Sequence, residues 1–111
     1  MEIVKRAEKD NCIIAAVNGR IDAVTAPEFE RQLNDWVAQG RSDLLMDLNG
    51  LDYISSAGLR SMLGIAKKLK KDGRALMLCS LTDTVKEVFD ISGFNTIIPI
   101  YNSVETALKK R

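Results

Sequence analysis

Two adjacent serines near the middle of the chain, Ser55 and Ser56, are the side chains best placed for chemistry. They follow an apolar segment at residues 44–48 and stand directly before residues 59–69, whose apolar positions recur with helical spacing. This order places two hydroxyls at the N-terminus of a helix, where unpaired backbone N–H groups and the positive end of the helix dipole favour an anion. A serine in that place can cap the helix, bind an anion or accept a phosphoryl group.

Ser56 is the first candidate for modification, and Ser55 is the second. Gly58 leaves the backbone beside the hydroxyls open, while Leu59 and Met62 begin the apolar face of the helix. The serine pair is therefore expected to lie outside the core. The competing interpretation is that one serine only caps the helix, a role worth about 1 kcal/mol. Taken alone, these residues favour the cap, because serine is a common N-cap residue.

The absence of histidine excludes several kinds of site. The chain has no histidine, so it lacks the usual general base for a serine or cysteine nucleophile. It also lacks the commonest zinc ligand, and the two distant cysteines, Cys12 and Cys79, do not make a structural zinc site. Each cysteine lies in an apolar segment without a CxxC pattern, which predicts buried free thiols in a reducing, cytoplasmic compartment. We expect no metal and no cofactor.

Length and composition predict a single domain over residues 1–111. The chain is 46% hydrophobic and 28% charged, with a formal net charge of +1, which gives no electrostatic reason to expect nucleic-acid or membrane binding. No signal-peptide pattern follows Met1, and no apolar run reaches the about 20 residues that span a bilayer. A small surface of mixed charge favours a monomer.

The order of predicted elements is ββαβαβαβα. Strands are predicted at residues 2–7, 12–17, 44–48, 75–79 and 97–100, with a turn at Asp10-Asn11 that makes the first two an antiparallel hairpin. Strands that alternate with single helices imply mostly parallel pairing and right-handed crossovers. The expected fold class is an α/β sandwich with a mixed, mostly parallel sheet and about four helices.

Polar residues are expected to cap the helices. Thr25 precedes the first helix, and Glu28 is placed to complete a capping box with it. The other expected caps are Thr82 or Thr84 for the third helix and Ser103 for the fourth. The buried face of the second helix is expected to consist of Leu59, Met62, Leu63, Ala66 and Leu69.

Three segments in this order resemble the STAS domain, specifically that of bacterial anti-sigma factor antagonists: Gly19-Arg20-Ile21-Asp22, Leu45-Met46-Asp47-Leu48 and Tyr53-Ile54-Ser55-Ser56-Ala57-Gly58-Leu59-Arg60. The resemblance covers nearly the whole chain, including the order of elements and Ser80-Leu81 before the third helix. It implies a STAS-type sandwich.

The resemblance also implies a partner switch. In this family the unphosphorylated antagonist binds an anti-sigma factor that is also a serine kinase, and so frees the sigma factor. The kinase phosphorylates a serine at the start of the second helix, which breaks the complex, and a PP2C-type phosphatase restores it. The family pattern Asp-Ser-Ser/Thr-Gly-Leu places that serine at Ser56, with Ser55 in place of the aspartate and Ala57 in place of the second hydroxyl residue. The implied partner-binding residues are Asp22, Ser55, Ser56, Ala57, Gly58 and Arg60.

For some residues, and for the function itself, the sequence leaves more than one interpretation. Asp22 either contacts the partner or the phosphoacceptor, or makes a local turn bond. Asp47 lies within an apolar strand, so its carboxylate needs a partner and is expected to tie the loop behind the serines. A STAS-like scaffold in a lipid-transport or other signalling complex, without phosphorylation, is the alternative function. An aspartyl-phosphate receiver using Asp47 is disfavoured, because the acidic pair and late lysine of such a domain are missing.

Overall fold

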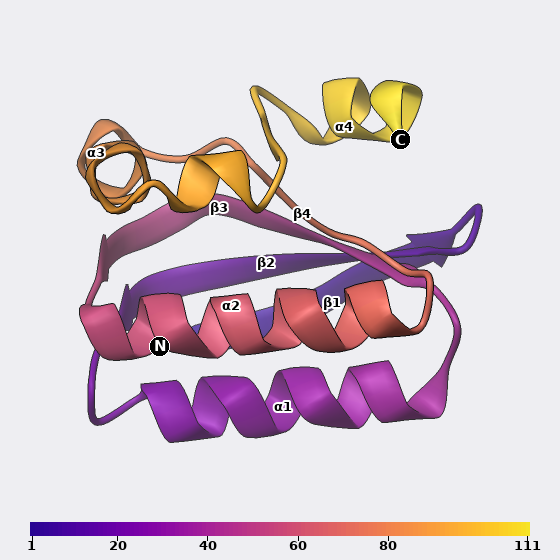
Figure 1. The fold of residues 1–111 in the computed structure, drawn as a ribbon, viewed down its shortest axis with the longest axis horizontal. Helices are drawn as coiled ribbons and strands as arrows, with labels where there is room; N and C mark the ends of the chain where they lie inside the picture. The colour runs from indigo at the N-terminus through magenta and orange to yellow at the C-terminus, as the bar shows by residue number, and fades with distance from the viewer.

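The computed structural model describes residues 1–111 and contains a five-stranded sheet with helices on both faces (Figure 1). The strands lie in the order in which they occur in the chain, and only β1 and β2 pair antiparallel. Their bounds are β1 Glu2–Lys9, β2 Cys12–Ile21, β3 Asp43–Ile54, β4 Leu76–Cys79 and β5 Ile100–Tyr101. The hairpin turn has positive φ at Asp10 (53°) and Asn11 (60°), which matches the twist of a two-residue β-hairpin. This confirms the predicted mixed α/β fold.

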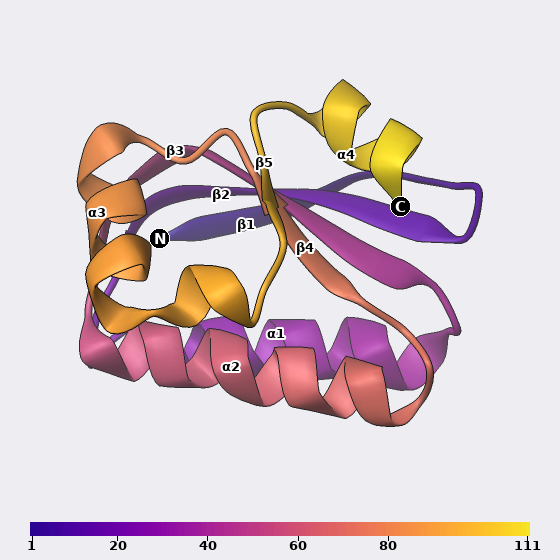
Figure 2. The same cartoon turned by 45° about the horizontal axis from the view of Figure 1, so that its top comes forward.

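Two helices cover one face of the sheet and a third covers the other. α1 (Ala26–Gln39) and α2 (Ser56–Lys71) lie side by side, and α4 (Val104–Lys110) lies on the opposite face (Figure 1). α3 (Asp83–Ser92) and the short 3-10 helix η1 (Phe94–Thr96) lie at the end of the sheet where α1 and α2 begin (Figure 2). The predicted cap Ser103 is confirmed, and of the two candidates for α3, Thr82 and Thr84, the cap is Thr82; their side chains accept hydrogen bonds from the backbone N–H groups of Thr106 and Val85, respectively.

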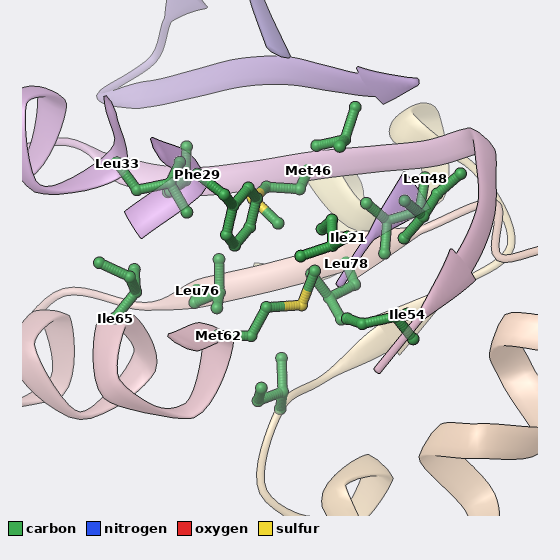
Figure 3. Packing of buried hydrophobic residues seen from close by; sticks show 14 of the residues in the cluster. Ile21, Phe29, Leu33, Met46, Leu48, Ile54, Met62, Ile65, Leu76 and Leu78 are labelled. Carbon is green, nitrogen blue, oxygen red and sulfur yellow. The ribbon is translucent and has the colours of Figure 1, made fainter. Parts of the chain in front are cut away.

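Alternation along the strands produces an apolar layer on each face of the sheet. The larger layer holds 21 buried residues, which come from the strands, from α1, α2 and α3, and from Ile98. Figure 3 shows side chains from β2, β3 and β4 meeting those of both long helices, among them Ile21, Met46, Leu78, Phe29 and Met62. The smaller layer lies under α4 and consists of Cys12, Ile14, Leu45, Met77, Cys79 and Ala107.

β3 is longer than the predicted strand at residues 44–48, because it continues through Asn49-Gly50 to Ile54. The continuation pairs with the end of β2, where Asn18 lies opposite Gly50. A Cβ atom on Gly50 would overlap the side chain of Asn18, so glycine permits this pairing instead of ending the strand. One uninterrupted strand therefore runs to the residue before Ser55.

The last strand also differs from the prediction at residues 97–100. Gly93 ends α3 with a φ of 78°, and the chain then forms η1 before it enters the sheet at Ile100. Ile97 is 55% exposed and belongs to no strand. The 3-10 helix that follows Gly93 therefore occupies residues close to the predicted start of the last strand, and the strand itself begins only at Ile100.

Two predicted details of the helices are wrong. The Thr25 hydroxyl accepts a hydrogen bond from the Asp22 N–H and makes no side-chain cap to α1, and Glu28 binds Arg31 instead of completing a capping box. On α2, Leu63 is only half-buried and Ile65 is buried in the core. The inward face of α2 is thus rotated slightly from the predicted one.

Candidate functional site

The serine pair lies where two parallel strands end together. Ile21 of β2 is in register with Ile54 of β3, and the Ser55 N–H donates to the Ile21 carbonyl oxygen at 2.8 Å. α2 begins directly after this bond, at the same end of the sheet as the start of α1 (Figure 2). Carboxyl ends of parallel strands are where open α/β sheets usually carry their sites.

The two serines have different environments. Ser55 is the N-cap of α2: its backbone is extended (φ −89°, ψ 173°) and its Oγ accepts from the Gly58 N–H at 3.3 Å. Ser56 is the first residue of the helix, is exposed, and its hydroxyl makes no hydrogen bond within the chain. The capping role therefore falls to Ser55, which leaves the hydroxyl of Ser56 free.

Gly58 brings the first turn of α2 close to both strand ends. It is buried, and a Cβ atom there would lie 2.7 Å from Cγ2 of Ile21 and 2.8 Å from Cγ1 of Ile54. Real Cβ atoms do not approach other atoms this closely. The missing side chain serves the packing of the helix, and this packing holds the Ser56 backbone at the end of the sheet.

Asp22 organises the loop between β2 and α1. Its Oδ1 accepts from the backbone N–H groups of Val24 (3.0 Å) and Thr25 (3.1 Å), and its Oδ2 accepts from Arg20 Nε at 3.3 Å. The hydrogen bond from the Thr25 backbone is the main reason that the pKa of Asp22 is lowered. Of the two interpretations of Asp22, the geometry fits the local turn bond, and no hydrogen bond joins its carboxylate to Ser56.

An aromatic and an aliphatic side chain stand exposed beside the serines. The guanidinium of Arg20 lies 4.7 Å from the centroid of the Tyr53 ring, and Tyr53 is 40% exposed. Val24, in the Asp22 loop, is 85% exposed. Sequence reasoning gave these side chains no role, although an aromatic residue just before a polar motif was a usable signal. We name the group Arg20, Val24, Tyr53, Ser56 and Arg60 the serine-end surface.

A groove of about 330 Å³ separates the first turns of α1 and α2. On the α2 side, Ala57 and Arg60 line it, and on the α1 side Glu30 does. The buried Ser61 hydroxyl donates to Glu30 Oε2 at 3.0 Å and so joins the two helices, and both residues line the groove. Arg60 is exposed and makes no hydrogen bond or ion pair within the chain. Its charge is available to a partner.

Asp47 points to the other face of the sheet. It is 9% exposed, and its Oδ2 accepts from Arg6 Nη1 at 2.7 Å while its Oδ1 accepts from the Asn49 N–H at 3.0 Å. The buried carboxylate therefore has the partner that it needs, and it ties the strand extension behind the serines. This is a structural role at a distance from the serine-end surface.

The two cysteines are buried free thiols, as predicted. Both lie in the apolar layer under α4. Burial raises the pKa of Cys12 and raises that of Cys79 to about 11, so both remain protonated near neutral pH. A protonated, covered thiol is a poor nucleophile and a poor metal ligand. No three His, Cys, Asp or Glu side chains are arranged to hold a metal ion.

Comparison with known proteins identifies the family. A model of the STAS domain matches residues 4–107. The chain belongs to the STAS domain family. A protein of Bordetella bronchiseptica, BtrV, whose name gives anti-sigma factor antagonism as its proposed role, is 44% identical over 98 residues, which cover 88% of this chain and 84% of BtrV. The anti-sigma-B factor antagonist of Staphylococcus aureus is 24% identical over 102 residues, covering 92% of this chain and 94% of that protein.

Solved structures share the fold of this STAS domain. The anti-sigma factor antagonist SpoIIAA in its unphosphorylated form superposes with a TM-score of 0.83 at 17% identity, covering 98% of this chain and 95% of SpoIIAA. The phosphorylated form of SpoIIAA, from Bacillus, superposes with a TM-score of 0.74 at 16% identity, and 98% of each chain is covered. None of the helices of this STAS domain combines the length and the apolar character needed to cross a membrane.

Proposed function

We propose that this STAS domain is an anti-sigma factor antagonist that binds an anti-sigma factor with serine kinase activity and is switched off by phosphorylation of Ser56. One observation carries the proposal: in the serine pair, the hydroxyl of Ser56 is exposed and free of hydrogen bonds, while Ser55 caps the helix. The name of the 44% identical relative BtrV supports the same role.

The proposed interface is centred on the serine-end surface. Tyr53 and Val24 supply exposed apolar area, and aromatic side chains and arginine are the residues that most often dominate binding energy at interfaces. A partner that covers these side chains also removes water from around Ser56. In this proposal the domain binds a partner and performs no chemistry itself, and no side chain that could act as a general base is hydrogen-bonded to the free hydroxyl of Ser56.

Phosphorylation acts on this interface through charge. A phosphoserine adds about −1.5 to −2 charges at pH 7. A charge that is buried at an interface without a partner of opposite sign costs about 2–5 kcal/mol of binding free energy. A cost of about 3 kcal/mol lowers affinity more than a hundredfold. The same phosphate interacts favourably with the N-terminus of α2, by about 0.3–1 kcal/mol, so the fold is retained. A PP2C-type phosphatase would restore the binding form.

The test is to find the phosphate and then to remove its acceptor. Peptide mass spectrometry of the protein isolated from its own host should locate a phosphate on Ser56. With the anti-sigma factor kinase of that host, Ser56→Ala should abolish phosphoryl transfer and still bind the kinase. Ser55→Ala is the matched control and should still be phosphorylated.

Two results would contradict the proposal. Phosphoryl transfer at an unchanged rate in Ser56→Ala would move the site to another residue. Absence of the phosphate under several growth conditions, together with no binding to the host's anti-sigma factors, would leave an unswitched STAS scaffold as the function.

A further inference from the structure

Ser56 and Arg60 are neighbours on the outer surface of α2. They lie four residues apart in the helix, and both are exposed. Residues with this spacing have Cβ atoms about 5–6 Å apart. Long side chains on a helix lean toward its N-terminus, so an arginine at position 60 is within reach of the first turn, which contains Ser56 and Ala57. Arg60 and Ala57 line the groove between α1 and α2, and Ser56 is not among its lining residues.

The guanidinium of Arg60 is uncommitted, which is unusual in this chain. Apart from Arg41 in the loop after α1, every other arginine pairs with a carboxylate: Arg6, Arg20, Arg31, Arg74 and Arg111. An arginine on a helix surface with no acidic partner retains all five N–H donors of its fork. Arg60 is therefore free to bind an anion that arrives on its own helix.

No carboxylate around the first turn of α2 holds Arg60. On α1, Glu30 accepts the hydrogen bond from Ser61, and in the β2–α1 loop Asp22 is engaged by the turn and by Arg20. Neither Asp52 on β3 nor Asp83 at the start of α3 pairs with Arg60, and Glu28 in the first turn of α1 pairs with Arg31. A phosphate on Ser56 would meet a free cation.

We propose that Arg60 binds the phosphate of phosphorylated Ser56, an inference that rests on the proposed function for the presence of that phosphate. The planar guanidinium fork matches phosphate oxygens and can form two parallel hydrogen bonds with them. Phosphorylation then removes the Arg60 cation from the serine-end surface at the same time as it adds an anion. An acidic group on the anti-sigma factor that binds Arg60 would lose its contact and meet the phosphate.

The test measures the phosphate directly. Phosphoserine is placed at position 56 during translation, by a suppressor tRNA that carries it, and the second pKa of the phosphate is followed by 31P NMR titration of the folded domain. A nearby cation favours the dianion, so this pKa should rise by about 0.15–0.4 units in Arg60→Gln, the shift that corresponds to an exposed ion pair at this helical spacing. Arg60→Lys should give an intermediate value, because lysine keeps the charge and lacks the fork.

Arg41→Gln is the matched control. It removes the same charge from the other end of α1, where Arg41 lines a surface hollow with Arg74, and it should leave the pKa of the phosphate unchanged. Equal pKa values in Arg60→Gln and the parent would overturn the proposal. A rise of the same size in Arg41→Gln would also overturn it, because net charge would then explain the effect. Since the phosphate is installed without a kinase, the shift can be present even if no kinase modifies Ser56, and the two proposals fail separately.

Discussion

Adding one methyl group to Gly58 should destabilise the domain, while adding the same group to Gly64 on the same helix should stabilise it. The new Cβ atom at position 58 would lie 2.7 Å from Ile21 Cγ2 and 2.8 Å from Ile54 Cγ1, and both of these residues are buried at the strand ends. At Gly64 nothing lies within 4 Å. Comparing the stabilities of the two variants therefore separates the effect of packing from the effect of helix propensity.

The expected magnitudes follow from these contacts. Overpacking a core position costs about 1–3 kcal/mol, and the preference of a helix for alanine over glycine offsets up to about 1 kcal/mol of it. Gly58→Ala should lose about 1–2 kcal/mol in net terms. Gly64→Ala should gain about 0.5–1 kcal/mol, because the site is open and the unfolded chain loses conformational freedom.

Urea denaturation followed by circular dichroism measures both variants. With an m-value of about 1–3 kcal/mol/M for a small domain, the midpoint of Gly58→Ala should fall by about 0.3–2 M and that of Gly64→Ala should rise. A Gly58→Ala protein as stable as the parent would refute the close approach of α2 to β2 and β3. Loss of stability in Gly64→Ala would show that the outer face of α2 is covered.

Other substitutions test the remaining assignments. Ser55→Ala should lose about 1 kcal/mol of unfolding free energy, because it removes the helix cap. Ser56→Ala should be within about 0.5 kcal/mol of the parent in stability. Equal losses for the two variants in urea denaturation would contradict the assignment of the cap to Ser55. Ile65→Ala should lose about 2–5 kcal/mol of unfolding free energy, and Leu63→Ala should lose clearly less. The reverse order would show that Leu63 faces the core, as the sequence predicted. The native Cys79 thiol should resist a thiol reagent at pH 8 and react after denaturation. Because folding raises the pKa of Cys79 to about 11, the stability linked to it is present at neutral pH and is lost as the pH rises above about 9 toward 11.

The sequence predicted those features that local patterns determine. The spacing of apolar residues predicts the order of strands and helices, Asp10-Asn11 marks the hairpin, Ser103 is the predicted cap of α4, and Thr82 is one of the two candidates for the cap of α3. Each of these signals is contained within a few neighbouring residues. Local chemistry is enough when the surrounding fold does not oppose it.

Features that depend on distant residues could not be predicted. Asn49-Gly50 has the composition of a turn, and only the position of Asn18 on the neighbouring strand shows that the glycine continues β3. Leu63 and Ile65 are both apolar, and the angle at which α2 packs on the sheet decides which one is buried. The exposure of Tyr53 likewise depends on what covers the end of β3.

The division of the serine pair is of the same kind. A shift of one residue in the start of α2 would exchange the roles of Ser55 and Ser56, and helix ends are uncertain by this amount in sequence reasoning. The hydrogen bond from the Ser55 N–H to the Ile21 carbonyl oxygen sets the start of the helix. A contact between two strands far apart in the chain therefore determines which serine is the cap.

This arrangement explains how a switch can work without disturbing the fold. Ser55 supplies the cap and Gly58 supplies the close packing, so the interactions that hold the first turn of α2 lie on residues other than Ser56. A group added to Ser56 breaks no hydrogen bond and fills no buried space, since its hydroxyl is exposed and unpaired. The modification therefore changes the free energy of binding at the serine-end surface, where the proposed partner binds. Under the proposed switch, each cycle of modification and restoration would change only the charge that the surface of the domain presents.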